Sequence, residues 1–277
     1  MIILYILITF LLVLFIAWVL MIKPSGQKHT LESEIKKFDY AHRGLHSKKN
    51  HIPENSMAAF RIAIEGGYGI ELDLHLNADG SLAVIHDTSL KRTAGVAVDI
   101  TALTDKETKS YPLDSSTELI PFFDEVLVEV SGRVPLLVEL KIDSNNHKEI
   151  CDKTIKSLAD YKGIYAIQSF DPRVVRYLRK RYPEVMRGQL AGYMRKNGDA
   201  LKLFLDFGLR NLLTNFLTKP HFIAYRVQDT HSPSMALCRK LYKPFELNWT
   251  CRKKEQTDIA RKNGAIPIFE GQGTPVK

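Results

Sequence analysis

The sequence predicts a parallel α/β barrel preceded by one apolar helix. The first 22 residues carry no charged side chain, and short apolar segments alternate with helical patterns from about residue 37 onwards. Polar residues stand at the carboxyl ends of several strand candidates, as barrel active sites require. No Gly-x-Gly-x-x-Gly motif or P-loop follows a strand candidate, so this sequence lacks the usual marker of the doubly wound nucleotide-binding folds.

Residues 1–22 are expected to form a transmembrane helix. At about 1.5 Å per residue they extend about 33 Å, enough to cross a hydrocarbon core of about 30 Å. A cleaved signal peptide would need a cationic start and a small-residue cleavage site, and neither is visible. Lys23 and a Pro-Ser-Gly break end the helix, and residues 23–37 form the predicted linker.

The basic residues after this helix predict its orientation. The lysines in the linker place the large domain in the cytoplasm by the positive-inside rule, as a single-pass membrane protein; they are Lys23, Lys28, Lys36 and Lys37. The formal net charge of +8 is scattered along the chain, which argues against nucleic acid as a partner and suits attraction to anionic lipid headgroups. Three widely spaced cysteines predict buried reduced thiols.

The barrel domain is predicted over residues 38–277. Its strand candidates are 38–42, 69–74, 82–86, 135–141, 164–168, 186–190, 222–226, 244–248 and 266–269. Helix candidates include 54–65, stopped by a Gly-Gly pair, 121–130, a helix from Pro172 that ends before Pro183, and 253–263. Nine strands exceed the eight of a regular barrel, and the link at 77–80 is too short for a helix, so we expect an irregularity there.

Two acidic residues share one face of the strand 69–74. Glu71 and Asp73 point one way, and the apolar residues at 70, 72 and 74 point the other, because strand side chains alternate. Two neighbouring carboxylates repel each other and resist desolvation, so a divalent cation is a physical reason to bring them together. The alternative at this point is an ordinary amphipathic strand with its polar face in water.

A series of motifs in fixed order extends over residues 40–271. They are Ala41-His42-Arg43-Gly44, Pro53-Glu54-Asn55-Ser56, Glu71-Leu72-Asp73-Leu74, His86-Asp87, Arg92-Thr93-Ala94-Gly95, Val138-Glu139-Leu140-Lys141, Ser169-Phe170-Asp171-Pro172 and Trp249-Thr250. Together they closely resemble the glycerophosphodiester phosphodiesterase family. This resemblance implies a somewhat irregular (β/α)8 barrel of the TIM type, which agrees with the strand count.

The resemblance also implies a role for each of seven residues. They are an acid and base pair, His42 and His86, the ligands of one divalent cation, Mg²⁺ or Ca²⁺, namely Glu71, Asp73 and Glu139, and two phosphate-binding cations, Arg43 and Lys141. Hydrolysis of an anionic phosphodiester with a poor leaving group needs charge neutralisation, an activated nucleophile and a proton for the leaving oxygen, and these residue types supply all three. The family's mechanism passes through a cyclic phosphate formed by the neighbouring glycerol hydroxyl.

Weaker candidates surround this set. Gln168 ends its strand near the site and is a candidate substrate contact, and Trp249 matches the family's tryptophan, which either stacks on glycerol or belongs to the core. His75 shares the face of the carboxylates: it is expected first at the surface or as a capping residue, and contact with the site is the alternative. Glu54 is expected to be structural, at the start of a helix, and His46 and His51 are expected in a loop.

Two segments depart from the family pattern. Arg252 follows the Trp-Thr-Cys run where the family carries an apolar residue and then Asn or Asp, and Glu270 stands in a closing strand without the usual Thr-Asp pair. Both are expected on the far side of the barrel from the metal ligands.

Three functions are therefore considered. The first is a membrane-anchored, metal-dependent glycerophosphodiesterase that releases glycerol phosphate and an alcohol. The second is a phospholipase D-like enzyme that acts on lysophospholipids. The third is a catalytically inactive, membrane-bound lipid-binding barrel, against which the presence of all seven residues argues.

Overall fold

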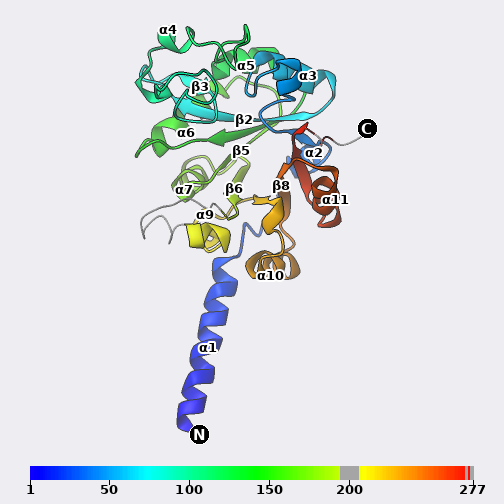
Figure 1. Cartoon of the computed structure of the whole chain (residues 1–277). Coiled ribbons are helices and arrows are strands. Elements are labelled where there is room, and N and C mark those ends of the chain that lie inside the picture. The colour runs from blue at the N-terminus through cyan, green and yellow to red at the C-terminus, as the bar shows by residue number, and fades with distance from the viewer. Residues whose placement is uncertain (194–205, 272–273, 275–277) are drawn as a thin grey trace.

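The chain folds into a closed barrel of eight parallel strands, with one apolar helix projecting from its side (Figure 1). The computed structural model describes residues 1–193, 206–271 and 274. The barrel strands are β1 (Tyr40–Ala41), β2 (Gly69–Leu76), β4 (Leu136–Leu140), β5 (Tyr165–Ser169), β6 (Arg187–Ala191), β7 (Phe222–Arg226), β8 (Phe245–Cys251) and β9 (Ile266–Phe269). Strand β1 pairs with both β2 and β9 and so closes the barrel. The predicted fold class is confirmed.

The third predicted strand, 82–86, is the one in excess of eight and explains the irregularity. Strand β3 (Leu82–Val84) pairs antiparallel with β2 and lies outside the ring, so the short link at 77–80 is a hairpin turn. All nine predicted strands exist, with ends that differ from the predicted ones by at most three residues.

Helices surround the barrel as the alternating pattern predicts. They are α2 (Glu32–Ile35), α3 (Met57–Glu65), α4 (Asp105–Thr108), α5 (Phe123–Val130), α6 (His147–Ser157), α7 (Pro172–Arg181), α9 (Asn215–Thr218), α10 (Pro233–Tyr242) and α11 (Lys254–Lys262). Local capping defines their ends: Ser56 accepts a hydrogen bond from the Ala59 amide at the start of α3, and Asp171 accepts one from the Arg173 amide at the start of α7.

The alternation along β2 directs its carboxylates into the barrel. Ile70, Leu72 and Leu74 are fully buried against the outer helices, in a cluster that includes residues of α3 and α5. Burial of each such side chain contributes about 1.5–3 kcal/mol. Glu71 and Asp73 therefore point to the barrel interior, and the amphipathic strand with its polar face in water is excluded because every β2 residue is buried.

Helix α1 (Ile2–Met21) is long and apolar enough to cross a membrane, and it is the one such helix in the described ranges. The following segment, predicted as a linker, packs on the barrel: the Ser25 amide donates to the Pro220 carbonyl at 2.9 Å, and Ile35 is buried. Pro24, also buried, begins this docked segment instead of a flexible one. The domain boundaries themselves stay a prediction.

Candidate active site

Strand register brings the polar residues of three neighbouring strands to one level inside the barrel. Asp73 pairs in register with Glu139, and Glu139 pairs with Gln168. They lie toward the carboxyl ends of β2, β4 and β5. Because residues in register on parallel strands point to the same side, their side chains converge in the interior.

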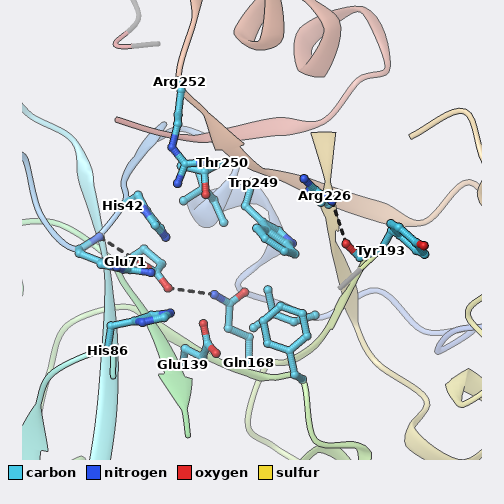
Figure 2. A pocket seen from close by; sticks show the side chains of 14 residues that line it. His42, Glu71, His86, Glu139, Gln168, Tyr193, Arg226, Trp249, Thr250 and Arg252 are labelled. Carbon is cyan, nitrogen blue, oxygen red and sulfur yellow. Dashed lines mark hydrogen bonds between the residues drawn. The ribbon is translucent and has the colours of Figure 1, made fainter. Parts of the chain in front are cut away.

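A cavity of about 380 Å³ opens at this level. Figure 2 shows side chains from both halves of the sequence pointing into it. Its polar lining includes His42, Arg43, Glu71, His86, Glu139, Gln168, Trp249 and Arg252. A second cavity of about 750 Å³ shares His86, Glu139 and Phe170 with the first and continues to Lys141. The predicted site residues thus line these two cavities, except Asp73, which is buried beside Glu71 and Glu139.

Three carboxylates form the centre of the site. Oxygen atoms of Glu71, Asp73 and Glu139 lie within 4.8 Å of one another, and all three residues are buried. Lys141 Nζ lies 3.0 Å from Asp73 Oδ1 and 2.5 Å from Glu139 Oε1, and Arg43 Nε lies 3.3 Å from Asp73 Oδ2. Three carboxylate donors at this spacing fit a hard divalent cation.

The pKa values of these carboxyls reflect their crowding. Burial raises the pKa of Glu71 well above its usual value, and the charges of Asp73 and Glu139 raise it further. Burial also raises the pKa of Glu139, although Lys141 opposes the change. Burial acts in the same direction on Asp73, but nearby cations, first Lys141, hold its pKa well below the usual range. One carboxyl therefore resists ionisation unless more positive charge is supplied.

Two histidines flank the carboxylates, and a neighbouring carboxylate orients each of them. His42 Nδ1 lies 2.9 Å from Glu270 Oε2, and His86 Nδ1 lies 2.6 Å from Asp87 Oδ1. An ionised carboxylate only accepts hydrogen bonds, so each Nδ1 carries the proton and each neutral ring keeps Nε2 as a free acceptor. Both rings line the cavity (Figure 2).

Burial lowers the pKa of both imidazoles. For His42 the Glu270 carboxylate opposes this shift. For His86 burial lowers the pKa to about 4, with Lys141 and Arg43 acting in the same direction and Asp73 against it. Neutral imidazoles that can accept a proton are therefore present at neutral pH.

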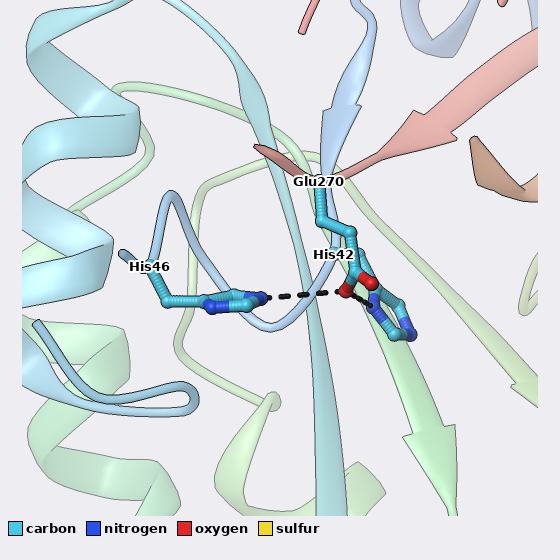
Figure 3. Close-up of side chains that lie close together, drawn as sticks. All are labelled: His42, His46 and Glu270. Carbon is cyan, nitrogen blue, oxygen red and sulfur yellow. Dashed lines mark hydrogen bonds and ion pairs between the residues drawn. The ribbon is translucent and has the colours of Figure 1, made fainter. Parts of the chain in front are cut away.

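Glu270 is the contact that sequence reasoning missed. It accepts a hydrogen bond from His42 and lies 3.4 Å from His46 Nε2 (Figure 3). It also forms an ion pair with Arg252. These three partners hold its pKa below the usual range although burial opposes the shift. The expectation that Glu270 lies on the far side of the barrel from the metal ligands is wrong, because β9 pairs with β1, which in turn pairs with β2. Arg252 follows β8, across the ring from β4, and lines the same cavity as Glu71 and Glu139.

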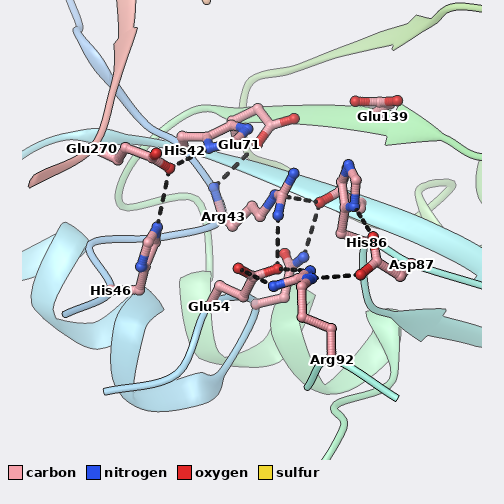
Figure 4. A network of polar contacts seen from close by, with 12 residues as sticks. His42, Arg43, His46, Glu54, Glu71, His86, Asp87, Arg92, Glu139 and Glu270 are labelled. Atoms are coloured by element: carbon pink, nitrogen blue, oxygen red, sulfur yellow. Dashed lines mark hydrogen bonds and ion pairs between the residues drawn. The ribbon is translucent and has the colours of Figure 1, made fainter. Parts of the chain in front are cut away.

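Arg43 is fixed by a second network of polar contacts. Its Nη1 lies 2.7 Å from Glu54 Oε1, and Arg92 Nη2 lies 2.7 Å from the same oxygen (Figure 4). Hydrogen bonding to Arg92 and the charge of Arg43 lower the pKa of Glu54 to about 2 against the effect of burial. Glu54 is thus structural, but as the link between two arginines. Asn55, also missed, donates to Asp73 Oδ2 at 2.9 Å.

The weaker candidates Gln168 and Trp249 lie at the cavity, whereas His75 lies behind His86. Gln168 Nε2 donates to Glu71 Oε1 at 3.4 Å, and Trp249 lines the cavity while its Nε1 donates to the Ala224 carbonyl. His75 is buried and not at the surface: its Nδ1 lies 2.7 Å from Asp143, and its Nε2 lies 3.0 Å from the His86 carbonyl. His75 therefore supports the loop that carries His86.

Comparisons with known proteins agree with the resemblance that the sequence motifs carry. The sequence model described as the glycerophosphoryl diester phosphodiesterase family matches residues 42–239. A glycerophosphodiester phosphodiesterase of Caldanaerobacter subterraneus subsp. tengcongensis is 36% identical over 163 residues, which cover 54% of this chain and 65% of the relative. A human protein named lysophospholipase D is 35% identical over 105 residues, which cover 33% of each chain.

Among solved structures, a phosphodiesterase of Oleispira antarctica in complex with the product sn-glycerol-3-phosphate has the same fold. Its TM-score is 0.67 at 20% identity, with 84% of this chain and 92% of that chain covered. The alignments with the curated relatives are shorter. This chain spans 46% of the length of one glycerophosphodiester phosphodiesterase and 65% of another.

Proposed function

Because this chain belongs to the glycerophosphoryl diester phosphodiesterase family, we propose that it hydrolyses glycerophosphodiesters to glycerol phosphate and an alcohol. The observation that carries this proposal is a cavity lined by two carboxylate-oriented imidazoles and by Glu71 and Glu139, with Asp73 buried beside these two carboxylates. This arrangement supplies an acid, a base and a site for positive charge, as phosphodiester hydrolysis requires.

Glu71, Asp73 and Glu139 would hold one divalent cation, Mg²⁺ or Ca²⁺. When bound, the cation supplies charge that neutralises the phosphate and the developing alkoxide. Arg43 lines the first cavity and Lys141 the second, and each carries a positive charge beside the carboxylates to bind the phosphate oxygens. Gln168 and Trp249 line the same space and would contact the glycerol half of the substrate.

His42 and His86 would transfer the protons in two steps. In the first, one imidazole Nε2 accepts the proton of the glycerol hydroxyl beside the phosphate, whose oxygen attacks phosphorus. The other imidazole, which enters this step protonated on Nε2 beside the anionic phosphate, donates that proton to the departing alcohol oxygen, and a cyclic phosphate forms. In the second step water opens the ring and the two imidazoles exchange roles. An intramolecular nucleophile removes much of the entropic barrier to attack.

The first test is the substitution His42→Ala in the full chain. We expect turnover of glycerophosphodiesters to fall by about 10²–10⁴-fold, the usual contribution of a general acid or base. The matched control is His231→Ala, because His231 is exposed and lines neither cavity. Equal turnover by the parent chain and His42→Ala would remove His42 from the mechanism, and no turnover by the parent chain would favour the inactive lipid-binding barrel.

The cyclic intermediate has its own test. A substrate whose hydroxyl beside the phosphate is methylated should not be hydrolysed, because that hydroxyl is the nucleophile. Steady turnover of this analogue would mean direct attack by water.

A second candidate substrate is a lysophospholipid. It is favoured by the human relative named lysophospholipase D and by the second cavity, whose lining includes Leu140, Ile142, Phe170 and Leu209. Mass spectrometry of the products from glycerophosphocholine and lysophosphatidylcholine separates the two activities. Consumption of the acylated substrate alone would exclude the first.

Helix α1 would anchor the enzyme as a single-pass membrane protein with the barrel in the cytoplasm. Its apolar side chains are exposed along most of its length, and basic residues follow it, as on cytoplasmic sides. Digestion of sealed inverted vesicles with protease tests this orientation, because a cytoplasmic barrel would be cleaved without detergent.

A further inference from the structure

The end of helix α1 is built into the barrel. Trp18 Nε1 donates to Ser234 Oγ at 3.1 Å, and the Tyr242 hydroxyl donates to the Val19 carbonyl at 2.8 Å. The Asn215 side chain donates to the carbonyl of Ile22, which is fully buried in a cluster with residues of β7 and α10. Such contacts fix the direction of α1 relative to the barrel and favour a retained helix over a cleaved signal sequence.

No polar spacer separates the apolar helix from the barrel. Ile16 and Leu20 are 48% and 58% exposed in the same turns as the docked Trp18, and the first charged residue is Lys23. The apolar surface available to lipid therefore continues to the level at which α1 contacts the barrel. A bilayer around α1 would reach the helices that hold it.

Exposed apolar side chains gather on the same helices. Phe216 and Leu217 on α9 are 40% and 38% exposed, and Leu241 on α10 is 47% exposed. Figure 1 shows α9 and α10 as the barrel helices nearest the end of α1. These two helices also supply the side chains that hold the end of α1, namely Asn215 on α9 and Ser234 and Tyr242 on α10.

The charge of this region is also uneven. Residues 207–243 contain six lysines and arginines and one aspartate, whereas the whole chain has 39 basic and 31 acidic residues. Lys240 and Lys243 are exposed beside Leu241. Basic side chains beside apolar ones suit the boundary between anionic headgroups and acyl chains.

From these observations we propose that the α9–α10 face, defined by Phe216, Leu217, Lys240, Leu241 and Lys243, rests on the surface of an anionic lipid bilayer. The proposal rests on the membrane role of α1 given above and adds a second contact between enzyme and lipid. The barrel is then not free to rotate above the membrane, because α1 and this face hold it at two places.

The docked end of α1 is also linked to the first cavity. The Tyr225 hydroxyl, from the cluster that buries Ile22, donates to the Arg210 carbonyl at 2.6 Å. The Arg210 guanidinium lies 4.6 Å from the ring centroid of Tyr193, which lines the first cavity. A short series of contacts thus joins the docked end of α1 to the mouth of the site.

Site-specific labelling of the full chain in lipid vesicles tests the contact. Leu241→Cys carries an environment-sensitive fluorophore, and the matched control is Val128→Cys on α5, where the side chain is 79% exposed. Cys151, Cys238 and Cys251 are buried, and burial raises the pKa of each thiol, so the introduced cysteine reacts first. The vesicles contain phosphatidylglycerol, phosphatidylcholine and a lipid with a nitroxide near its headgroup.

We expect severalfold stronger quenching at position 241 than at position 128. Equal quenching at the two positions would overturn the proposal. Leu217→Cys repeats the measurement if Leu241→Cys does not fold. The double substitution Lys240→Glu and Lys243→Glu should weaken quenching at position 217 in anionic vesicles. Unchanged quenching would show that these two charges do not contribute to the contact with lipid. Hydrolysis of glycerophosphocholine in detergent is measured separately, so failure of the proposed activity is distinguished from failure of this contact.

Discussion

At the scale of single residues, the site depends on how each imidazole is held. Asp87 is adjacent to His86 in the sequence, whereas Glu270 is separated from His42 by 228 positions. Both carboxylates bind Nδ1 and leave Nε2 toward the cavity. Glu270 also opposes the lowering of the His42 pKa by burial. In the proposed mechanism Glu270 is therefore a positioning residue that acts through His42.

Replacement of Glu270 by Gln tests this role. The amide oxygen can still accept from Nδ1, but the negative charge is lost, so the His42 pKa should fall further. We expect kcat to fall by about 10–100-fold, less than for loss of the imidazole itself, and the acidic limb of the pH profile of kcat/KM to move to lower pH.

The control for this prediction is Glu255→Gln, because Glu255 is exposed on α11. Glu270→Asp, which keeps the charge, should recover the position of the acidic limb in part. A Glu270→Gln enzyme with the parent's kcat and pH profile would show that Glu270 has only a structural role.

At the scale of elements, the segment between α1 and β1 is held by contacts with residues distant in the sequence, which its composition does not reveal. His29 Nε2 donates to the Glu184 carbonyl at 2.9 Å, and its ring centroid lies 4.8 Å from that of His221. His221 Nδ1 accepts from the Arg187 amide at 3.3 Å. The proline and glycine of this segment predict a flexible linker, but its buried residues dock it on β6 and β7.

His221 should make stability depend on pH. Burial, with Arg187 and His29 nearby, lowers its pKa to about 3, whereas an unfolded histidine titrates near about 6.5. Above the unfolded value the ring is neutral in both states. As the pH falls from about 6.5 toward 3, the unfolded chain binds a proton that the folded chain does not, so the free energy of unfolding decreases.

His221→Asn should reduce this loss, because asparagine does not titrate and its amide oxygen can accept from the Arg187 amide. The measurement is the denaturant midpoint of the full chain in detergent between about pH 7 and about pH 5. His231→Asn is the control at an exposed histidine. Parallel pH dependence in the parent and His221→Asn would contradict the prediction.

At the scale of the whole molecule, barrel closure brings three carboxylates and two cationic side chains together in one buried interior. Glu71, Asp73 and Glu139 come from two strands, Arg43 follows β1, and Lys141 follows β4. Their burial in one interior leaves Glu71 with a raised pKa because the two cations do not fully offset three carboxylates. A bound divalent cation should therefore stabilise the fold as well as the reaction.

Metal binding should raise the unfolding temperature. A ligand at 100 times its Kd contributes about 2.7 kcal/mol, and each kcal/mol corresponds to about 2–4 °C for a domain of this size. We expect Mg²⁺ or Ca²⁺ to raise Tm by several degrees and chelation to reverse the rise. Differential scanning calorimetry of the full chain in detergent measures both.

The variant Glu71→Gln should lose this rise, because one of three oxygen ligands loses its charge. Without metal it should be at least as stable as the parent, since the substitution removes repulsion. Glu255→Gln on the exposed face of α11 should keep the full rise. A metal-dependent rise of the same size in Glu71→Gln would place the cation elsewhere.

The sequence by itself determined the class of fold, the strands, the apolar helix and the motif residues, because periodicity and motif spacing are local properties of the chain. The alternation of Glu71 and Asp73 with buried neighbours was readable for the same reason. Only the tertiary structure decided that Glu270 meets His42, that the predicted linker docks, and that α9 and α10 receive the end of α1. Those contacts depend on barrel closure and strand register, which join residues up to 228 positions apart and leave no local pattern in the sequence.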